Sequence, residues 1–389
     1  MNKLLHIRRW LAVVFAASLC MIAGAQQLDP VNCEVSLLTA DAGYELYATF
    51  GHSAIRVRDT LSGYDAVFNY GMFDFNAPNF YGNFAQGRMI YCLGVQKYER
   101  FIGAYAYEDR EIREQLLLLN AEQKDFIIRF LLNNAKPENR NYHYHFFLDN
   151  CATRIRDLID KTFGEVTWLP AVASPSYREL VYDCTLNQPW GRFGIDIALG
   201  LPTDKKTDAW EQMFLPDYLS DAVATATCHG KPIAGEIHAA FKPENPLVVQ
   251  PSRIIPMMVC CAVLALALLF CFVQRGARVF DFFFFLVIGL IGVLVVFLWF
   301  FTDHTNTHGN LNIIWALPTH LVMAFYLLIR RKTAFFRWYF LVTAVIASLL
   351  LVSWAFLPQH LNQALMPVVV AIVLRACYNS RIFQRRSQP

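Results

Sequence analysis

One cysteine stands where the sequence predicts a reactive thiol. Residues 142–147 alternate aromatic and polar side chains, the pattern of a half-buried strand. Asp149 and Asn150 break this alternation and are good N-cap residues, and the spacing after them predicts an amphipathic helix from Cys151. Backbone N–H groups and the helix dipole meet in the first turn of a helix, where they lower a thiol pKa and offer donors to an oxyanion. Cys151 is therefore the candidate nucleophile.

A nucleophilic thiol needs a base within hydrogen-bond reach, and His52 is the candidate. Gly51 before it permits a close backbone approach, and strand alternation places His52 and Ala54 on one face. A lone histidine on a strand is more often a packed core residue. The order along the chain favours catalysis, because a Gly-His pair comes first, a further strand follows, and Asn-Cys then begins a helix.

The cysteine count leaves a second interpretation of Cys151 open. The chain has ten cysteines, and an oxidising compartment favours pairing. Five of them lie in the expected outer domain, so at least one thiol stays free, and Cys151 is the best candidate. The alternative is that Cys151 is half of a disulfide. The pairing of the others stays open: Cys33, Cys92, Cys184 and Cys228.

A zinc site is a further alternative. His143 and His145 alternate on one strand face near Cys151, and with His52 they would make three histidines and one cysteine. No Cys-x-x-Cys or His-Glu-x-x-His spacing supports that interpretation. We therefore expect no metal and no other cofactor, and we expect His145 to support the catalytic cleft.

Composition places part of this chain of 389 residues in lipid. Hydrophobic residues make up 56% of it, and its mean hydropathy is +0.32. A net charge of +3 is too small to indicate nucleic-acid binding. Residues 1–25 have a basic start, an apolar run and a small-residue site, which predict a cleaved signal peptide; an uncleaved anchor is the alternative.

The rest of the chain divides into an outer domain, 26–250, and a membrane domain, 251–389. In the outer domain we expect two helices, 98–115 and 121–134, before the strand and helix around Cys151, and these earlier strands: 33–39, 45–50, 52–58, 64–70 and 89–95. In the membrane domain five apolar segments are near the length that spans a bilayer: 254–273, 280–301, 313–329, 336–356 and 361–376.

The loops between these segments predict their orientation. Arginine or lysine residues lie in the loops 274–278 and 330–337 and in the tail 381–386, whereas the loops 302–312 and 358–360 have none. By the positive-inside rule the basic loops are cytoplasmic. We therefore expect an inner-membrane protein with its catalytic domain on the periplasmic side and its C-terminus in the cytoplasm.

Three sequence blocks carry a resemblance to a known family. They are FGHSAIRV at 50–57, NYG at 69–71 and FLDNCATRIRD at 147–157. Together they resemble the Lnb-type lipoprotein N-acyltransferases, within the circularly permuted papain-like enzymes that include NlpC-type amidases and lecithin–retinol acyltransferase-like proteins. The resemblance implies a permuted papain-like α+β domain followed by an all-α bundle of five transmembrane helices.

The resemblance also implies an activity and roles. Such enzymes move an acyl chain from the diacylglyceryl group of a lipoprotein to the α-amine of its N-terminal cysteine, leaving a lyso form. Diacylglyceryl lipoproteins and membrane phospholipid would be the partners. Cys151 would form a thioester and His52 would act as base, with Asn69 as the orienting third residue and Tyr70 or Asn150 as its rivals.

Other positions and functions stay open. Arg154 could meet a lipid or lipoprotein head region, although arginines on helix surfaces are usually solvated. The aromatic stretch 73–84 could cover an acyl chain or pack on its own domain, and Asn310, Asn312 and Pro318 could shape a lateral lipid entrance. The alternatives to acyl transfer are a membrane-tethered cell-wall amidase or thiol peptidase, and a non-catalytic receptor or assembly factor.

Overall fold

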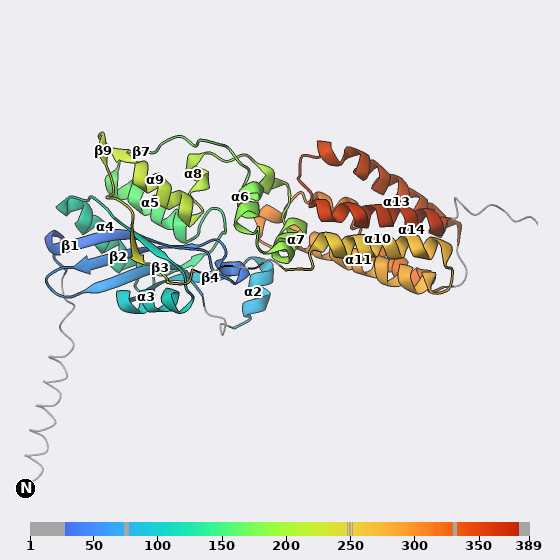
Figure 1. The fold of residues 1–389 in the computed structure, drawn as a ribbon, viewed down its shortest axis with the longest axis horizontal. Coiled ribbons are helices and arrows are strands. Elements are labelled where there is room, and N and C mark those ends of the chain that lie inside the picture. Colours follow the sequence, from blue (N-terminus) through green and yellow to red (C-terminus); the bar gives the residue numbers. More distant parts are fainter. Residues whose placement is uncertain are drawn as a thin grey trace, which may run out of the picture.

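The structure is a computed structural model, and it describes residues 28–73, 78–246, 248, 250, 252–329 and 333–380. The expected signal peptide, 1–25, lies outside the described residues. The described chain has an N-terminal part of mixed strands and helices and a C-terminal part made of helices (Figure 1).

A seven-stranded antiparallel sheet is the centre of the N-terminal part. Its strand order is β10-β5-β1-β2-β3-β4-β6, so sequence neighbours β1 to β4 lie side by side. The strands are β1 Cys33–Ala40, β2 His52–Asp59, β3 Asp65–Met72, β4 Ile90–Lys97, β5 Ile112–Leu116, β6 Asn141–His143 and β10 His238–Phe241.

Strand alternation decides which side chains meet which helices. Leu37 and Ile55 are paired in register and share a buried core with three helices: α4 Ala121–Asn134, α5 Cys151–Phe163 and α9 Pro216–Thr225. The next residues along, Leu38 and Ala54, pack on the other face against Phe101 of α3 Tyr98–Tyr107. Figure 1 shows α3 on the opposite side of the sheet from α5 and α9. Both faces are therefore covered, and the sheet ends remain as places for a site.

Smaller elements complete this part. They are the helices α2 Phe80–Gln86, α6 Tyr177–Cys184, α7 Pro189–Ala198 and α8 Ala209–Gln212, the turn η3 Leu201–Asp204, and a small sheet of β7 Val166–Thr167, β8 Thr227–Cys228 and β9 Lys231–Pro232.

Three expected elements were wrong in part. Residues 45–50 form no strand but the short 3₁₀ turn η2 Leu46–Ala48, because β1 already pairs with β2 and β5 and offers no free edge. The helix expected over 98–115 ends at Tyr107, since Asp109 adopts a left-handed φ of 52° and the chain turns back into β5. The strand before Cys151 ends at His143, and a tight turn joins His145 to Asp149.

The C-terminal part contains the helices α10 Pro256–Phe272, α11 Ala277–Phe300, α12 Thr319–Leu327, α13 Ala334–Ser353 and α14 Met366–Ser380. Among the described residues, three helical stretches are long and apolar enough to cross a membrane: Ala277–Phe300, Ala334–Phe356 and Gln363–Ser380. The apolar segments Pro256–Phe272 and Leu311–Leu327 are shorter. The expected segment 313–329 is not one helix, because the turn η5 Leu311–Ile314 and Pro318 interrupt it before α12.

Close contacts and one ion pair hold the bundle. Gly292 of α11 touches the backbone of Ala316 so closely that a Cβ there would lie 2.0 Å from the carbonyl oxygen. Arg375 of α14 and Asp281 of α11 are both buried and form a two-pronged ion pair, with Nε to Oδ1 at 2.6 Å and Nη2 to Oδ2 at 2.9 Å. Asn379 donates a third hydrogen bond to Asp281 at 2.8 Å.

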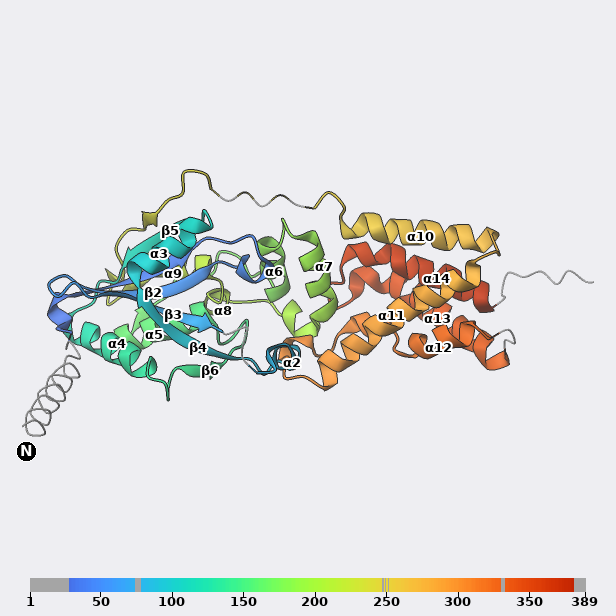
Figure 2. The same cartoon turned by 90° about the horizontal axis from the view of Figure 1, so that it is seen from below.

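A buried polar junction joins the two parts. The side-chain amides of Asn312 and Gln359, each at most 1% exposed, donate to the carbonyls of Asp196 and Leu199 in and after α7. A Cβ on Gly200 would lie 2.0 Å from the His308 carbonyl oxygen, so only glycine fits there. Figure 2 shows α7 and α2 between the sheet and the helical bundle. The outer loops of the bundle are therefore the platform on which the sheet domain sits.

Candidate active site

His52 and Asn69 meet because neighbouring strands place them on one face. The register pairs Ile55 of β2 with Phe68 of β3, which makes His52 and Asn69 diagonal neighbours at the sheet end. His52 Nε2 lies 2.5 Å from the Asn69 side-chain oxygen. Because an amide oxygen only accepts, Nε2 carries the proton, and Nδ1 is the nitrogen available to a thiol.

Cys151 is the first residue of α5, directly after the N-cap Asn150. The Asn150 side chain accepts the N–H groups of Ala152 and Thr153, both at 2.9 Å, and the Thr153 hydroxyl accepts the N–H of Asn150 in return at 2.8 Å. This reciprocal capping fixes the first helical turn. The half-buried Cys151 thiol hydrogen bonds to His52 and also receives backbone hydrogen bonds from Ser53 and Ala152.

The electrostatics favour a thiolate beside an imidazolium. Burial alone would raise the pKa of Cys151, but the charge and hydrogen bond of His52 and the N–H groups of Ser53 and Ala152 lower it below its usual value. Burial alone would lower the pKa of His52, but the Cys151 charge and hydrogen bond and the Asn69 oxygen raise it. A cysteine in this state is a nucleophile at neutral pH.

Gly71 and Tyr142 complete the surroundings of the thiol. Gly71 has a φ of +87°, and a Cβ there would lie 3.8 Å from the Cys151 Cβ. Tyr142 of β6 is buried, and none of the described residues accepts a hydrogen bond from its hydroxyl. Burial and then the Cys151 charge raise the Tyr142 pKa, so its hydroxyl stays neutral.

The two rivals of Asn69 are engaged elsewhere. Tyr70 points to the other side of the sheet, where its hydroxyl donates to the Asn134 side chain at 2.7 Å. Asn150 uses its side-chain oxygen in the helix cap and its nitrogen on the carbonyls of Phe146 and Phe214, each at 2.8 Å. Among the three candidates, Asn69 is the one that the structure places against His52.

Arg154 and His145 have structural partners. Arg154 forms a two-pronged ion pair with Asp149 and lies 3.6 Å over the Tyr142 ring, so it braces the turn before Cys151. His145 Nδ1 accepts the Leu148 N–H, and its Nε2 lies 3.0 Å from the Thr305 hydroxyl of the bundle's outer loop. The turn that leads into α5 is thus hydrogen-bonded to a loop of the helical bundle.

The comparisons with known proteins bear on this geometry. Residues 23–181 match the family model described as the Lnb N-terminal periplasmic domain, and residues 248–387 match the one described as the Lnb transmembrane domain. The chain belongs to the Lnb family. No curated protein and no solved structure matches the chain. Family membership makes the N-terminal part periplasmic and places the protein in the inner membrane, as a membrane protein of lipoprotein modification.

Cysteine pairing in this Lnb-family chain differs from what composition favours. The five outer-domain cysteines are all free in the structure. Burial, with help from Asp217 and Asp183, raises the pKa of Cys184 to about 12, so this thiol is poorly reactive beside Cys151. In the described part of the chain, no group of three His, Cys, Asp or Glu side chains is placed to hold a metal, and His143 is exposed.

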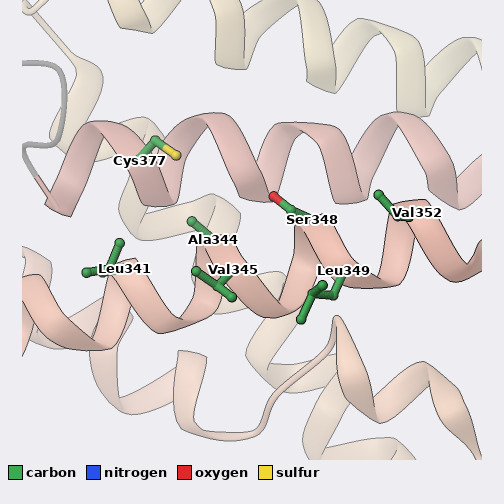
Figure 3. A pocket seen from close by; sticks show the side chains of 7 residues that line it. All are labelled: Leu341, Ala344, Val345, Ser348, Leu349, Val352 and Cys377. Atoms are coloured by element: carbon green, nitrogen blue, oxygen red, sulfur yellow. The ribbon is translucent and has the colours of Figure 1, made fainter.

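An apolar hollow in the membrane domain is separate from the site. It has a volume of about 290 Å³ and lies along α13 beside Cys377 of α14 (Figure 3). Its lining comes from these two helices alone, so it does not contact Cys151, His52 or Asn69. Asn310 and Asn312, expected at a lipid entrance, are instead buried in the junction with α7.

Sequence reasoning missed several residues of the site. The Ser53 N–H and Gly71 contribute through backbone geometry, which residue type alone does not reveal. The glycine in the NYG block was the available signal for Gly71. The partnership of His145 with the outer loop joins residues 160 positions apart and has no local signal.

Proposed function

We propose that this protein is a lipoprotein N-acyltransferase that works through a Cys151 thioester. The acyl donor is the diacylglyceryl group of a lipoprotein, and the acceptor is the α-amine of the N-terminal cysteine of a lipoprotein. The observation that supports this most is the contact of Cys151, His52 and Asn69 on a domain that is docked on the outer loops of a membrane bundle. The Lnb family match points to the same chemistry.

In the first half-reaction the Cys151 thiolate attacks the carbonyl carbon of the ester, and a C–S bond forms. The N-cap uses the N–H groups of Ala152 and Thr153, which leaves the Cys151 N–H for the developing oxyanion. The C–O bond then breaks, and the glyceryl oxygen takes the proton of the His52 imidazolium. The products are the lyso-glyceryl group and a thioester on Cys151.

In the second half-reaction the neutral α-amine attacks the thioester carbonyl. His52 accepts the proton that the nitrogen loses, the C–S bond breaks, and the Cys151 thiolate and imidazolium are restored. Asn69 keeps the proton on Nε2 throughout, so that Nδ1 always faces the reacting atoms. The cycle uses no external oxidant, metal or cofactor.

The chain order supports the fold assignment within this proposal. The histidine strand comes before the cysteine helix, as in the circularly permuted papain-like enzymes, and we propose that arrangement for the periplasmic domain. We also propose that all five apolar segments of the bundle cross the bilayer, with η5 and α12 together forming the third crossing. The arginines at 275–278 and 381–386 would then lie in the cytoplasm together with the C-terminus.

Mass spectrometry of a lipoprotein N-terminal peptide tests this proposal. The host lacks its own N-acylation enzyme and carries this protein, its Cys151→Ala form or its Cys184→Ala form. An N-acyl, lyso-glyceryl peptide with the wild type and Cys184→Ala, and none with Cys151→Ala, is the expected result. An N-acyl peptide that keeps both glyceryl chains would make phospholipid the donor. An unchanged diacyl peptide with every form would overturn the proposal and favour the amidase or receptor alternatives.

A further inference from the structure

The helix α2 exposes aromatic side chains that a water-facing surface does not favour. Tyr81 is 79% exposed and Phe84 is 56% exposed, whereas Phe80, whose ring contacts both, is buried. Figure 2 shows α2 at the boundary between the sheet domain and the bundle. Aromatic residues are favoured at the headgroup level of a membrane, where an apolar ring meets a wet surface.

Several contacts fix α2 at the outer end of a membrane helix. The His304 Nε2 lies 3.0 Å from the Phe84 carbonyl oxygen, and the Asp303 N–H donates to the Gln86 carbonyl at 2.8 Å. Arg88 forms an ion pair with Asp303 at 2.8 Å. These bundle residues closely follow α11, which ends at Phe300. The exposed face of α2 therefore lies next to the end of α11.

From α2 an unbroken series of aromatic rings leads inward to the site. Successive ring centroids are 6.5, 5.9, 5.2 and 4.1 Å apart along the series Phe84, Phe80, Phe73, Tyr91 and Tyr144. Tyr144 and Cys151 pack against the same buried core. The series therefore runs from the junction with the bundle to the core against which Cys151 packs.

We propose that this aromatic series is the surface along which one acyl chain of a membrane-held substrate lies when its ester reaches the Cys151 sulfur. The inference rests on the proposed function and names the apolar subsite that it requires. Moving an acyl chain from the bilayer into water raises its free energy by about 0.8 kcal/mol per methylene. A surface made of aromatic rings avoids that loss.

Chain length separates this inference from the proposed function. The full-length protein in detergent is given either a dipalmitoyl or a water-soluble dibutanoyl form of a diacylglyceryl lipopeptide whose α-amine is acetylated, so that the acyl-enzyme accumulates. The readout is acylated Cys151 by intact mass. We expect Phe84→Ser and Tyr91→Ser to slow acylation by the dipalmitoyl substrate at least about tenfold. This corresponds to an activation free energy higher by about 1.4 kcal/mol. The dibutanoyl substrate, too short to reach α2, should react at nearly the wild-type rate with Phe84→Ser.

Two control variants sharpen the result. Phe84→Leu keeps an apolar side chain and should retain most of the dipalmitoyl reaction. Phe126→Ser removes an exposed aromatic of α4 whose ring stacks on Phe130 at 6.4 Å, much as Phe84 stacks on Phe80, and should have no effect. Equal losses with both substrates, or no loss in Phe84→Ser, would overturn the acyl path. A wild-type protein that forms no thioester with either substrate would overturn the proposed function itself.

Discussion

Each half of the molecule contains a small cluster of polar side chains, and the two clusters differ in what is left unpaired. In the bundle, Asp281 receives three hydrogen bonds from Arg375 and Asn379, and all three residues are buried. In the periplasmic domain Cys151 is partly buried, and one nitrogen of His52 contacts Asn69 while the other faces the thiol.

The Arg375–Asp281 ion pair is closed and acts as a structural clamp, whereas the Cys151–His52 pair is open to a substrate. In a closed, buried ion pair the attraction between the charges roughly offsets the cost of desolvating them, so the pair adds little net stability. Removing one partner, however, leaves an uncompensated charge in the protein. An open pair leaves a lone pair and a proton for a substrate, and the electrostatics hold it in its charged form. Breaking the first cluster should therefore cost stability, and breaking the second should cost activity.

The largest effect is expected at the nucleophile. Cys151→Ala should lower N-acylation at least ~10³-fold, since no other group replaces the sulfur. The free energy of unfolding should change by no more than about 1 kcal/mol, because the side chain is small and the change removes a single sulfur atom. Product formation by mass spectrometry and thermal unfolding measure the two quantities. Retention of a tenth of the activity would exclude Cys151 as the nucleophile.

The clamp should respond in the opposite way. Arg375→Met leaves Asp281 buried without its partner and should lower stability by about 3–5 kcal/mol, measured by denaturant unfolding in detergent. The double variant Arg375→Met with Asp281→Leu should recover most of that loss. Activity per folded molecule should stay near wild type. A single variant as stable as the wild type would mean that the pair is not a clamp.

Thiol reactivity tests the open pair. Because the pKa of Cys151 is lowered, the thiol stays deprotonated to lower pH than an ordinary cysteine. Its alkylation should therefore remain fast from pH 8 to below pH 7. In His52→Ala the rate should fall about tenfold per pH unit below the ordinary thiol pKa of about 8.5. Cys184 is an internal reference, since its pKa of about 12 predicts slow labelling. Superimposable profiles for the wild type and His52→Ala would count against the pair.

The smallest of these effects is expected at the orienting residue. Asn69→Ala removes a hydrogen bond to a charged ring, worth about 1.5–3 kcal/mol, and should lower kcat roughly 10- to 100-fold with KM little changed. Tyr70→Phe is the matched control, because its hydroxyl binds Asn134 instead, and it should keep more than a third of the activity. A larger loss in Tyr70→Phe than in Asn69→Ala would exchange their roles.

The sequence was most informative where a local pattern carried the geometry. Asn150 before Cys151 is a helix-capping signal, and the alternation around His52 gives the face of its strand, so the meeting of these elements could be predicted. The pattern of residues 45–50 predicts a strand, but both edges of β1 are already paired, with β2 and β5. Pairing in a sheet is a competition between distant segments, and propensity alone does not settle it.

The contacts that join the sheet domain to the bundle could not be predicted from the sequence. Arg88 with Asp303 and His145 with Thr305 join residues more than 150 positions apart, through polar side chains that look like ordinary surface residues in the sequence. Because Asn310 and Asn312 interrupt an apolar region, the sequence left open that they shape a lateral lipid entrance. They are buried because they satisfy the carbonyl groups of α7.

The most direct test of the central claim is to trap the acyl-enzyme. The full-length protein is incubated with a dipalmitoyl lipopeptide whose α-amine is acetylated, so that the second half-reaction has no acceptor. The account predicts a protein mass increased by one palmitoyl group, located on Cys151, removed by neutral hydroxylamine and absent from Cys151→Ala. A protein that N-acylates the free-amine lipopeptide but never carries the palmitoyl group on Cys151 would contradict the thioester mechanism.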